Sequence, residues 1–124
     1  MKHSSLVLGW FFVLLAACGN SGLAAMRTAV EVEMVNQSSR DLENAEARFG
    51  EHVCKWGSVV KGASKSYMYY PHPITGHAEL HWDAAGGHRV EKLDLSKTYL
   101  RGKAGRLTFT VYDDRVEARF REKS

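Results

Sequence analysis

Apolar and polar residues alternate along much of this chain. Residues 30–34 alternate strictly, so that Val30, Val32 and Met34 share one side and two glutamates take the other. Because successive side chains of a strand point to opposite faces, this period of two predicts a β-strand with one buried face.

The same period recurs towards the C-terminus and predicts six further strands, separated by turn-forming residues. These strands cover residues 42–49, 52–60, 66–70, 77–82, 107–111 and 116–120. The turns are expected at residues 36–39, 61–62, 71–73, 83–87 and 113–114. The side chains expected on the inner faces are mainly apolar: Ala45, Ala47, Phe49, Cys54, Trp56, Ala78, Leu80, Trp82, Val116, Ala118 and Phe120.

Two segments fit the alternation less simply. Residues 41–48 could instead form a short helix, an interpretation that the alternation favours less. In residues 89–95, Val90 and Leu93 fall on opposite faces, and a β-bulge would reconcile them.

Seven or eight short strands without a convincing helix predict an all-β domain. The expected architecture is an antiparallel β-sandwich, roughly immunoglobulin-like in layout but without the disulfide of true immunoglobulin domains. A small closed barrel is the alternative.

The first residues divide into the parts of an export signal. Lys2 gives a positive start, and residues 6–15 form an apolar run too short to span a bilayer as a helix. A run of this length after a basic residue is typical of a secretory signal peptide.

The run ends in Leu15-Ala16-Ala17-Cys18, which resembles the lipobox of bacterial lipoproteins. The resemblance implies cleavage before Cys18 and acylation of its thiol and new amine. Several acyl chains anchor a protein stably to a membrane. The alternative is an ordinary signal peptide cut near Gly22-Leu23-Ala24, which would release a soluble protein.

The lipobox resemblance also implies an address and a division of the chain. In enteric lipoproteins an Asp directly after the lipidated Cys tends to retain the protein in the inner membrane. This chain has Gly19 at that position, which implies the outer membrane, with the domain facing the periplasm. The expected parts are a signal peptide (1–17), the lipidated Cys with a short tether (18–27) and one domain (28–124).

A second resemblance covers residues 30–62. An opening strand leads to Asn36-Gln37-Ser38, and later come a Trp56-Gly57 step and a Lys61-Gly62 turn. This order is similar to that of small, uncharacterised Gram-negative lipoproteins. It implies a β-sandwich and little about activity.

The net charge and the cysteines limit which partners and which covalent bonds can be expected. The net charge of +3 falls to +2 without Lys2, which is too little to indicate nucleic-acid binding. Once Cys18 is lipidated, Cys54 has no intrachain partner, and we expect a buried thiol beside Trp56. Basic residues near the C-terminus predict a solvated face or, alternatively, a contact with anionic headgroups or an acidic glycan: Arg101, Lys103, Arg106, Arg115, Arg119, Arg121 and Lys123.

Histidines offer the main candidate for metal chemistry. His77 and His81 share the outward face of one strand, about 13 Å apart, which is too far for both to bind one zinc ion. Glu79 with one histidine, completed by His72 or His88 from a flanking loop, could hold Zn²⁺ or Cu²⁺. The competing interpretation is a solvated polar strand.

Catalytic motifs find little support. Ser58 follows Gly57 but lacks the second glycine of a nucleophile elbow, and Gly86-Gly87 lacks the residues of a phosphate loop. The adjacent acids Asp113-Asp114 fit a solvated turn. We therefore predict no enzyme and no cofactor beyond the covalent lipid, and a small envelope hydrolase ranks third among the functions.

Aromatic residues give the favoured functional surface. Tyr67, Met68, Tyr69 and Tyr70 put large side chains on both faces of one strand. Some of them must then be exposed or covered by a partner, and exposed tyrosine is common at protein and glycan contacts. The alternative is an edge strand with amphipathic tyrosines. We predict a non-catalytic binding or accessory module that contacts an envelope protein or peptidoglycan through Tyr67, Tyr69, Tyr70 and Pro71, with the loop at residues 72–77.

Overall fold

The computed structural model describes residues 30–99 and 102–123, which form eight strands and, within these ranges, no helix. The predicted signal peptide, Cys18 and the tether lie outside the described residues. Among the described residues no helix is long and apolar enough to cross a membrane. The strands are β1 (Val30–Asn36), β2 (Leu42–Phe49), β3 (His52–Val59), β4 (Ser64–Tyr70), β5 (His77–Ala84), β6 (Gly87–Asp94), β7 (Gly105–Val111) and β8 (Val116–Glu122).

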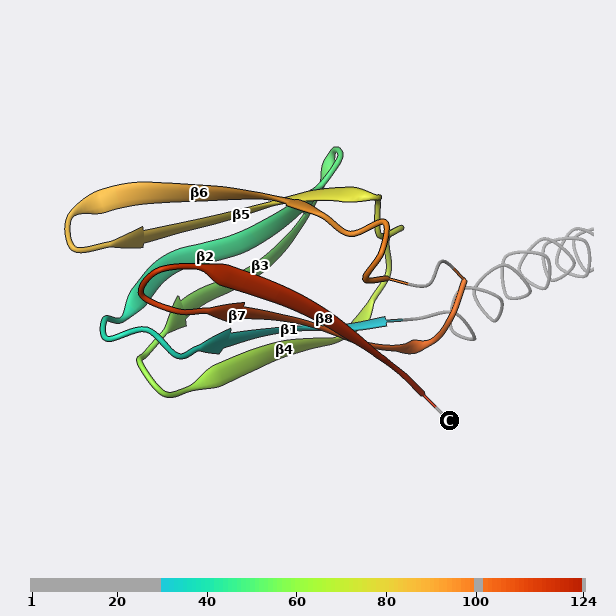
Figure 1. Ribbon diagram of the computed structural model, residues 1–124, viewed down its shortest axis with the longest axis horizontal. Coiled ribbons are helices and arrows are strands. Elements are labelled where there is room, and N and C mark those ends of the chain that lie inside the picture. The colour runs from blue at the N-terminus through green and yellow to red at the C-terminus, as the bar shows by residue number, and fades with distance from the viewer. Residues whose placement is uncertain (1–29, 100–101, 124) are drawn as a thin grey trace, which may run out of the picture.

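Two four-stranded sheets pack face to face (Figure 1). The first sheet has the order β4-β1-β7-β8 and the second the order β3-β2-β5-β6. The predicted β-sandwich is therefore confirmed, whereas the closed barrel and the helix over residues 41–48 are wrong.

The core follows the alternation of the sequence. In β1, Val30, Val32 and Met34 are buried while the residues between them are partly exposed. The inward side chains of β2, β3, β5 and β7 complete one apolar cluster between the sheets. The inward residues of β8 pack against this cluster only partly buried, because β8 is an edge strand.

Two features differ from the prediction of a purely antiparallel sandwich with a β-bulge in residues 89–95. β1 and β7 run parallel, with Val30 opposite Gly105, because β6 ends at the end of the sandwich where β1 begins and β7 starts from that same end. β6 pairs with β5 in unbroken register, so the bulge predicted there is wrong. Val90 is simply exposed, and Leu93 packs against the core.

Asn36 belongs to β1 and is fully buried, whereas the sequence suggested a turn residue. Its Nδ2 donates to the carbonyls of Arg40 (2.8 Å) and Val59 (2.9 Å), and its Oδ1 accepts from Ser38. A buried amide is tolerated when its hydrogen bonds are satisfied. Asn36 thereby links β1 of the first sheet to β3 of the second.

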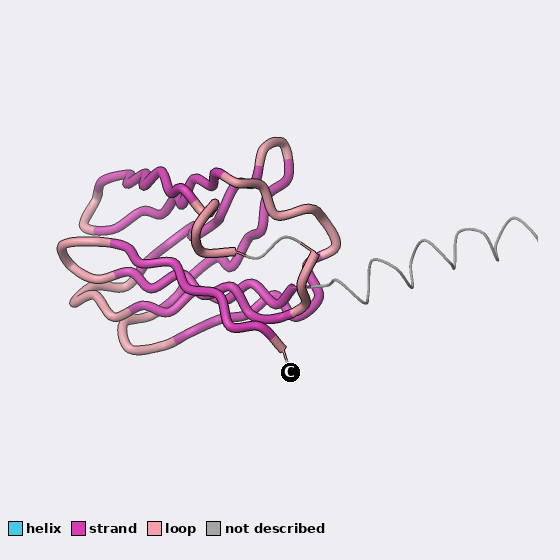
Figure 2. The backbone as a smooth tube through the Cα atoms, turned by 45° about the vertical axis from the view of Figure 1, so that its right-hand side comes forward, coloured by secondary structure: helices cyan, strands magenta, loops and turns pink. Residues whose placement is uncertain are grey.

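The loops gather at the two ends of the sandwich (Figure 2). We call the end where β1 begins the near end, on the right in Figure 1, and the opposite end the far end. At the far end, Asp41 accepts from the Lys61 amide, and Asp113 accepts from the amide and hydroxyl of Ser39. These contacts tie three loops together.

Candidate functional site

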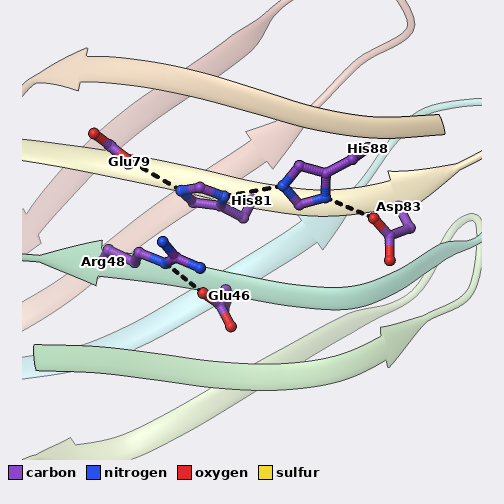
Figure 3. A network of polar contacts seen from close by, with 6 residues as sticks. All are labelled: Glu46, Arg48, Glu79, His81, Asp83 and His88. Atoms are coloured by element: carbon purple, nitrogen blue, oxygen red, sulfur yellow. Dashed lines mark hydrogen bonds and ion pairs between the residues drawn. The ribbon is translucent and has the colours of Figure 1, made fainter.

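The outer face of the second sheet carries a chain of polar contacts between β5 and β6 (Figure 3). Glu79 Oε1 lies 3.0 Å from His81 Nε2, and His81 Nδ1 lies 3.2 Å from His88 Nε2. His88 Nδ1 in turn lies 2.7 Å from Asp83 Oδ1. A carboxylate thus stands at each end of a pair of imidazoles.

Both carboxylates are held in the ionised form. The hydrogen bond from His81 lowers the pKa of Glu79. The hydrogen bond from the Asn44 amide, and after it the one from His88, lowers the pKa of Asp83. Since an ionised carboxylate only accepts, the imidazole nitrogens that face Glu79 and Asp83 donate to them.

Burial distinguishes the two histidines. His81 is only 7% exposed although it lies on the outer face, because its neighbours on the sheet cover it. The expectation that it points into solvent is therefore wrong. Next to His81, Arg48 Nε donates to Glu46 Oε2 at 2.6 Å. Several charged side chains of this face are therefore paired with one another.

The metal site predicted from His72, His77, Glu79, His81 and His88 is not assembled. Glu79, His81 and His88 meet in a chain, and His88 comes from β6 and not from a loop. His72 instead stacks on His52 with ring centroids 4.1 Å apart, and His77 pairs with Asp94 across the strands. Within residues 30–99 and 102–123 no three His, Cys, Asp or Glu residues are arranged to hold a metal ion. Metal binding stays a prediction that titration would test.

The aromatic strand β4 lies at the edge of the first sheet, and six of its seven residues are exposed. Tyr67, Met68 and Tyr69 are 44%, 54% and 71% exposed. Pro71 follows the strand and is also exposed. Large side chains therefore stand on both faces of an edge strand, as the sequence predicted.

Tyr70 does not belong to this exposed surface, and that part of the prediction is wrong. Its ring packs against Phe49 with centroids 5.5 Å apart, and burial raises the pKa of its hydroxyl to about 12. The cause is an irregular register in which Tyr67 faces Val32 and Tyr70 faces Val30, so that β4 carries one extra residue. This bulge turns both tyrosines towards the core side of β1 and breaks the simple alternation.

The outer face of β7 and β8 forms a third candidate surface. Arg106, Arg119 and Arg121 stand on it with Thr108, Thr110 and Tyr112, around a pocket of about 360 Å³. The sequence showed that basic residues accumulate here but did not show that three of them share one face.

The structure also places three residues that the sequence analysis considered: Cys54, Ser58 and Asp113. Cys54 is buried as expected, and burial raises the pKa of its thiol to about 12, which makes it a poor nucleophile. Ser58 is exposed and donates to Glu43. Asp113 does more than solvate a turn, because the hydrogen bonds from Ser39 lower its pKa.

Asp83 is the member of the polar chain that sequence reasoning missed. Ala84 pairs with Gly87 across a two-residue turn, so Asp83 necessarily lies opposite His88. Pairing the residues on either side of the Ala85-Gly86 turn, one step at a time, would have placed Asp83 opposite His88 from the sequence alone.

Comparison with known proteins supports the fold. No protein-family model matches the chain, and no curated protein matches it. A protein from Eubacterium rectale, whose structure was determined by NMR, is similar with a TM-score of 0.53 and 10% identity over 79% of this chain and 93% of that one. A crystal structure named "putative cell adhesion protein" from Bacteroides uniformis has a TM-score of 0.45 and 10% identity, over 78% of this chain and half of that one.

Proposed function

We propose that this protein is a lipid-anchored, non-catalytic binding module of a bacterial cell envelope, and that it binds an extended segment of a partner protein along β4. The observation that carries the proposal is the exposed aromatic edge of the first sheet. Anchoring at Cys18 rests on the lipobox resemblance, and the outer membrane with a periplasmic domain is the corresponding address.

The edge position of β4 leaves one side of its backbone without a strand partner among the described residues. An edge strand with unpaired amide and carbonyl groups is a template for another strand. Proteins usually blunt such edges with charges, prolines or bulges. β4 has a bulge near Tyr70, but between Lys65 and Pro71 it carries no charge and no proline. This argues for a covering partner.

The side chains of β4 suit a peptide partner better than a small ligand. Strand addition gains affinity from main-chain hydrogen bonds and specificity from alternate side chains. Tyr67 and Tyr69 offer broad rings with few rotatable bonds, so ordering them costs little entropy. Met68, which is 54% exposed, adds an adaptable apolar side chain to the same strand.

The proposal is tested in living cells with the tagged full-length protein. Chemical crosslinking, purification and mass spectrometry identify what accompanies it. The test variant is Tyr67→Ala/Tyr69→Ala, which leaves the buried Tyr70 in place. The matched control is Lys55→Ala/Ser58→Ala on β3, the corresponding edge of the second sheet, where both residues are exposed.

We expect one discrete partner that is lost with the tyrosine variant and kept with the control. A synthetic segment of that partner should then bind the purified protein. A partner retained by both variants, or no partner at all, would contradict strand addition at β4. Anchoring has its own test, since Cys18→Ser should abolish incorporation of labelled palmitate.

A further inference from the structure

Three arginines gather on the outer face of β7 and β8. Arg106 and Arg121 are directly opposite each other, and Arg119 is diagonal to Arg106. Like charges directly opposite each other on a sheet destabilise it. A sequence that keeps this pairing needs a compensating negative charge.

The described residues compensate only part of this charge. Glu31 pairs with Arg106 at 3.2 Å, but neither Arg119 nor Arg121 forms an ion pair within residues 30–99 and 102–123. Glu117 lies on the same face and is bound to Arg115 at 2.9 Å. Two guanidinium groups therefore remain available to an anion from outside.

The surface between the arginines fits a phosphate group. Arg106, Arg119 and Arg121 line a pocket of about 360 Å³, which continues along the face past Thr110 and Glu117 to Tyr112 at the far end. Guanidinium binds phosphate oxygens through paired hydrogen bonds.

The position of this face relative to the chain entry suggests where the phosphate comes from. Val30, where β1 begins, pairs with Gly105, and Gly105 pairs with Glu122. Since neighbouring strands lie about 5 Å apart, Arg106 and Arg121 stand about 5 and about 10 Å from the point of entry. Lys103 and Lys123 flank the same near end.

We infer that this arginine face docks on the anionic phospholipid surface of the membrane that carries the anchor. The inference rests on the proposed anchoring at Cys18. Eleven residues separate Cys18 from Val30 and span at most about 40 Å, so the near end lies within reach of the headgroups. The face then supplies a second membrane contact that orients the sandwich, with the first sheet towards the membrane and the second sheet away from it.

The test uses the full chain carrying Cys18→Ser, so that no acyl chain contributes. Partitioning is measured by co-sedimentation with vesicles of phosphatidylcholine and with vesicles of equal parts phosphatidylcholine and phosphatidylglycerol. The test variant is Arg119→Glu/Arg121→Glu. The control is Lys61→Glu/Arg89→Glu, which changes the net charge equally at exposed positions of the far end. The N-terminal segment is the same in all proteins, so its own affinity cancels.

We expect the test variant to bind anionic vesicles at least about 25-fold more weakly, because each basic residue near an anionic surface contributes about fivefold. Binding to neutral vesicles should not change, and the control should lose much less. Equal losses in both variants would show that net charge alone matters, and no loss would equally overturn the inference. Binding that inorganic phosphate displaces without a preference for anionic vesicles would also contradict it.

A second readout separates docking from misfolding. Arg121→Glu places an acid opposite Arg106, so its melting temperature should equal or exceed that of the parent protein. A melting temperature well below the parent would attribute the lost binding to unfolding, and Arg119→Gln/Arg121→Gln would then have to reproduce the loss for the inference to stand. Because acylation is absent from this assay, its failure is distinct from a failure of palmitate labelling.

Discussion

The outer faces of the two sheets differ in how their arginine side chains are paired. On the second sheet, Glu46 and Arg48 pair with each other, and Glu79 and Asp83 bind the two histidines. On the first sheet, Arg119 and Arg121 form no ion pair with described residues, and the other edge exposes the aromatic strand β4.

This difference indicates which sheet meets other molecules. A charge bound to its neighbour has little to gain from a ligand, because the ligand would have to replace an existing partner. An arginine without an ion pair or an exposed tyrosine has no protein partner to give up, so only its hydration and side-chain freedom oppose binding. Lys55 and Lys92 of the second sheet also form no ion pair among the described residues, so the contrast concerns the arginines and the aromatic edge and not every charge. The proposed contacts with other molecules both lie on the first sheet.

The largest effect is expected at Asn36, because its side-chain amide links the two sheets whose outer faces are compared. Replacing it by Ala leaves the buried carbonyl of Val59 without its donor, and we expect the free energy of unfolding to fall by about 3 kcal/mol. Urea denaturation measures this. Gln37→Ala, at an exposed neighbour, should change stability by less than about 0.5 kcal/mol. Similar values for both variants would refute the role of Asn36.

A more local disruption is available at Gly105, next to the arginine face. A Cβ atom there would lie 2.3 Å from the carbonyl oxygen of Arg121, so Gly105→Ala must displace β8. We expect a loss of about 2 kcal/mol in unfolding free energy. Gly76→Ala is the control, because a Cβ at Gly76 meets nothing within 4 Å. A Gly105→Ala protein as stable as this control would contradict the close packing of β7 and β8.

Removing one side chain from the outer face of each sheet compares what the two faces contribute to stability. His81→Ala removes a buried ring that contacts both Glu79 and His88, and should lower the unfolding free energy by about 1.5 kcal/mol. Arg119→Ala removes an exposed side chain without an ion pair and should cost less than about 0.5 kcal/mol. Thermal and urea unfolding of both variants would measure the two losses. Equal losses would mean that the two faces do not differ.

The smallest effect concerns the titration of Asp83. Because its pKa is lowered in the folded protein, its contribution to stability is present above the ordinary aspartate pKa and is lost as the pH falls through the lowered value. Asn44→Gly, which suits the positive φ of 51° there, should raise this pKa more than His88→Ala does. NMR titration of the carboxyl carbon measures both shifts. The opposite order would assign the main hydrogen bond to His88.

The sequence predicted the strands well because alternation is a local property. Residues 42–49 needed only their own pattern, and their inward Ala45, Ala47 and Phe49 are all buried. The parallel pairing of β1 with β7 depends on where a distant segment returns, and no local pattern encodes that.

The site was harder to predict for three physical reasons. One extra residue in β4 moved Tyr70 from the predicted surface into the core, because a bulge shifts every later side chain. The five predicted metal ligands do not meet at one point, since the His72 ring stacks on His52 and His77 lies opposite Asp94 at the start of β5. Metal binding itself stays a prediction. The arginine face depends on the register of β7 and β8, which composition alone does not give.

The central claim, that a partner protein lies along β4, is tested most directly by site-specific photocrosslinking in living cells. A photoreactive amino acid replaces Tyr69 in the full-length protein, and a matched probe replaces Lys55 on the edge of the second sheet. The account predicts one discrete crosslinked product from position 69 and none of that size from position 55. The same product from both positions, or no product from position 69, would contradict it.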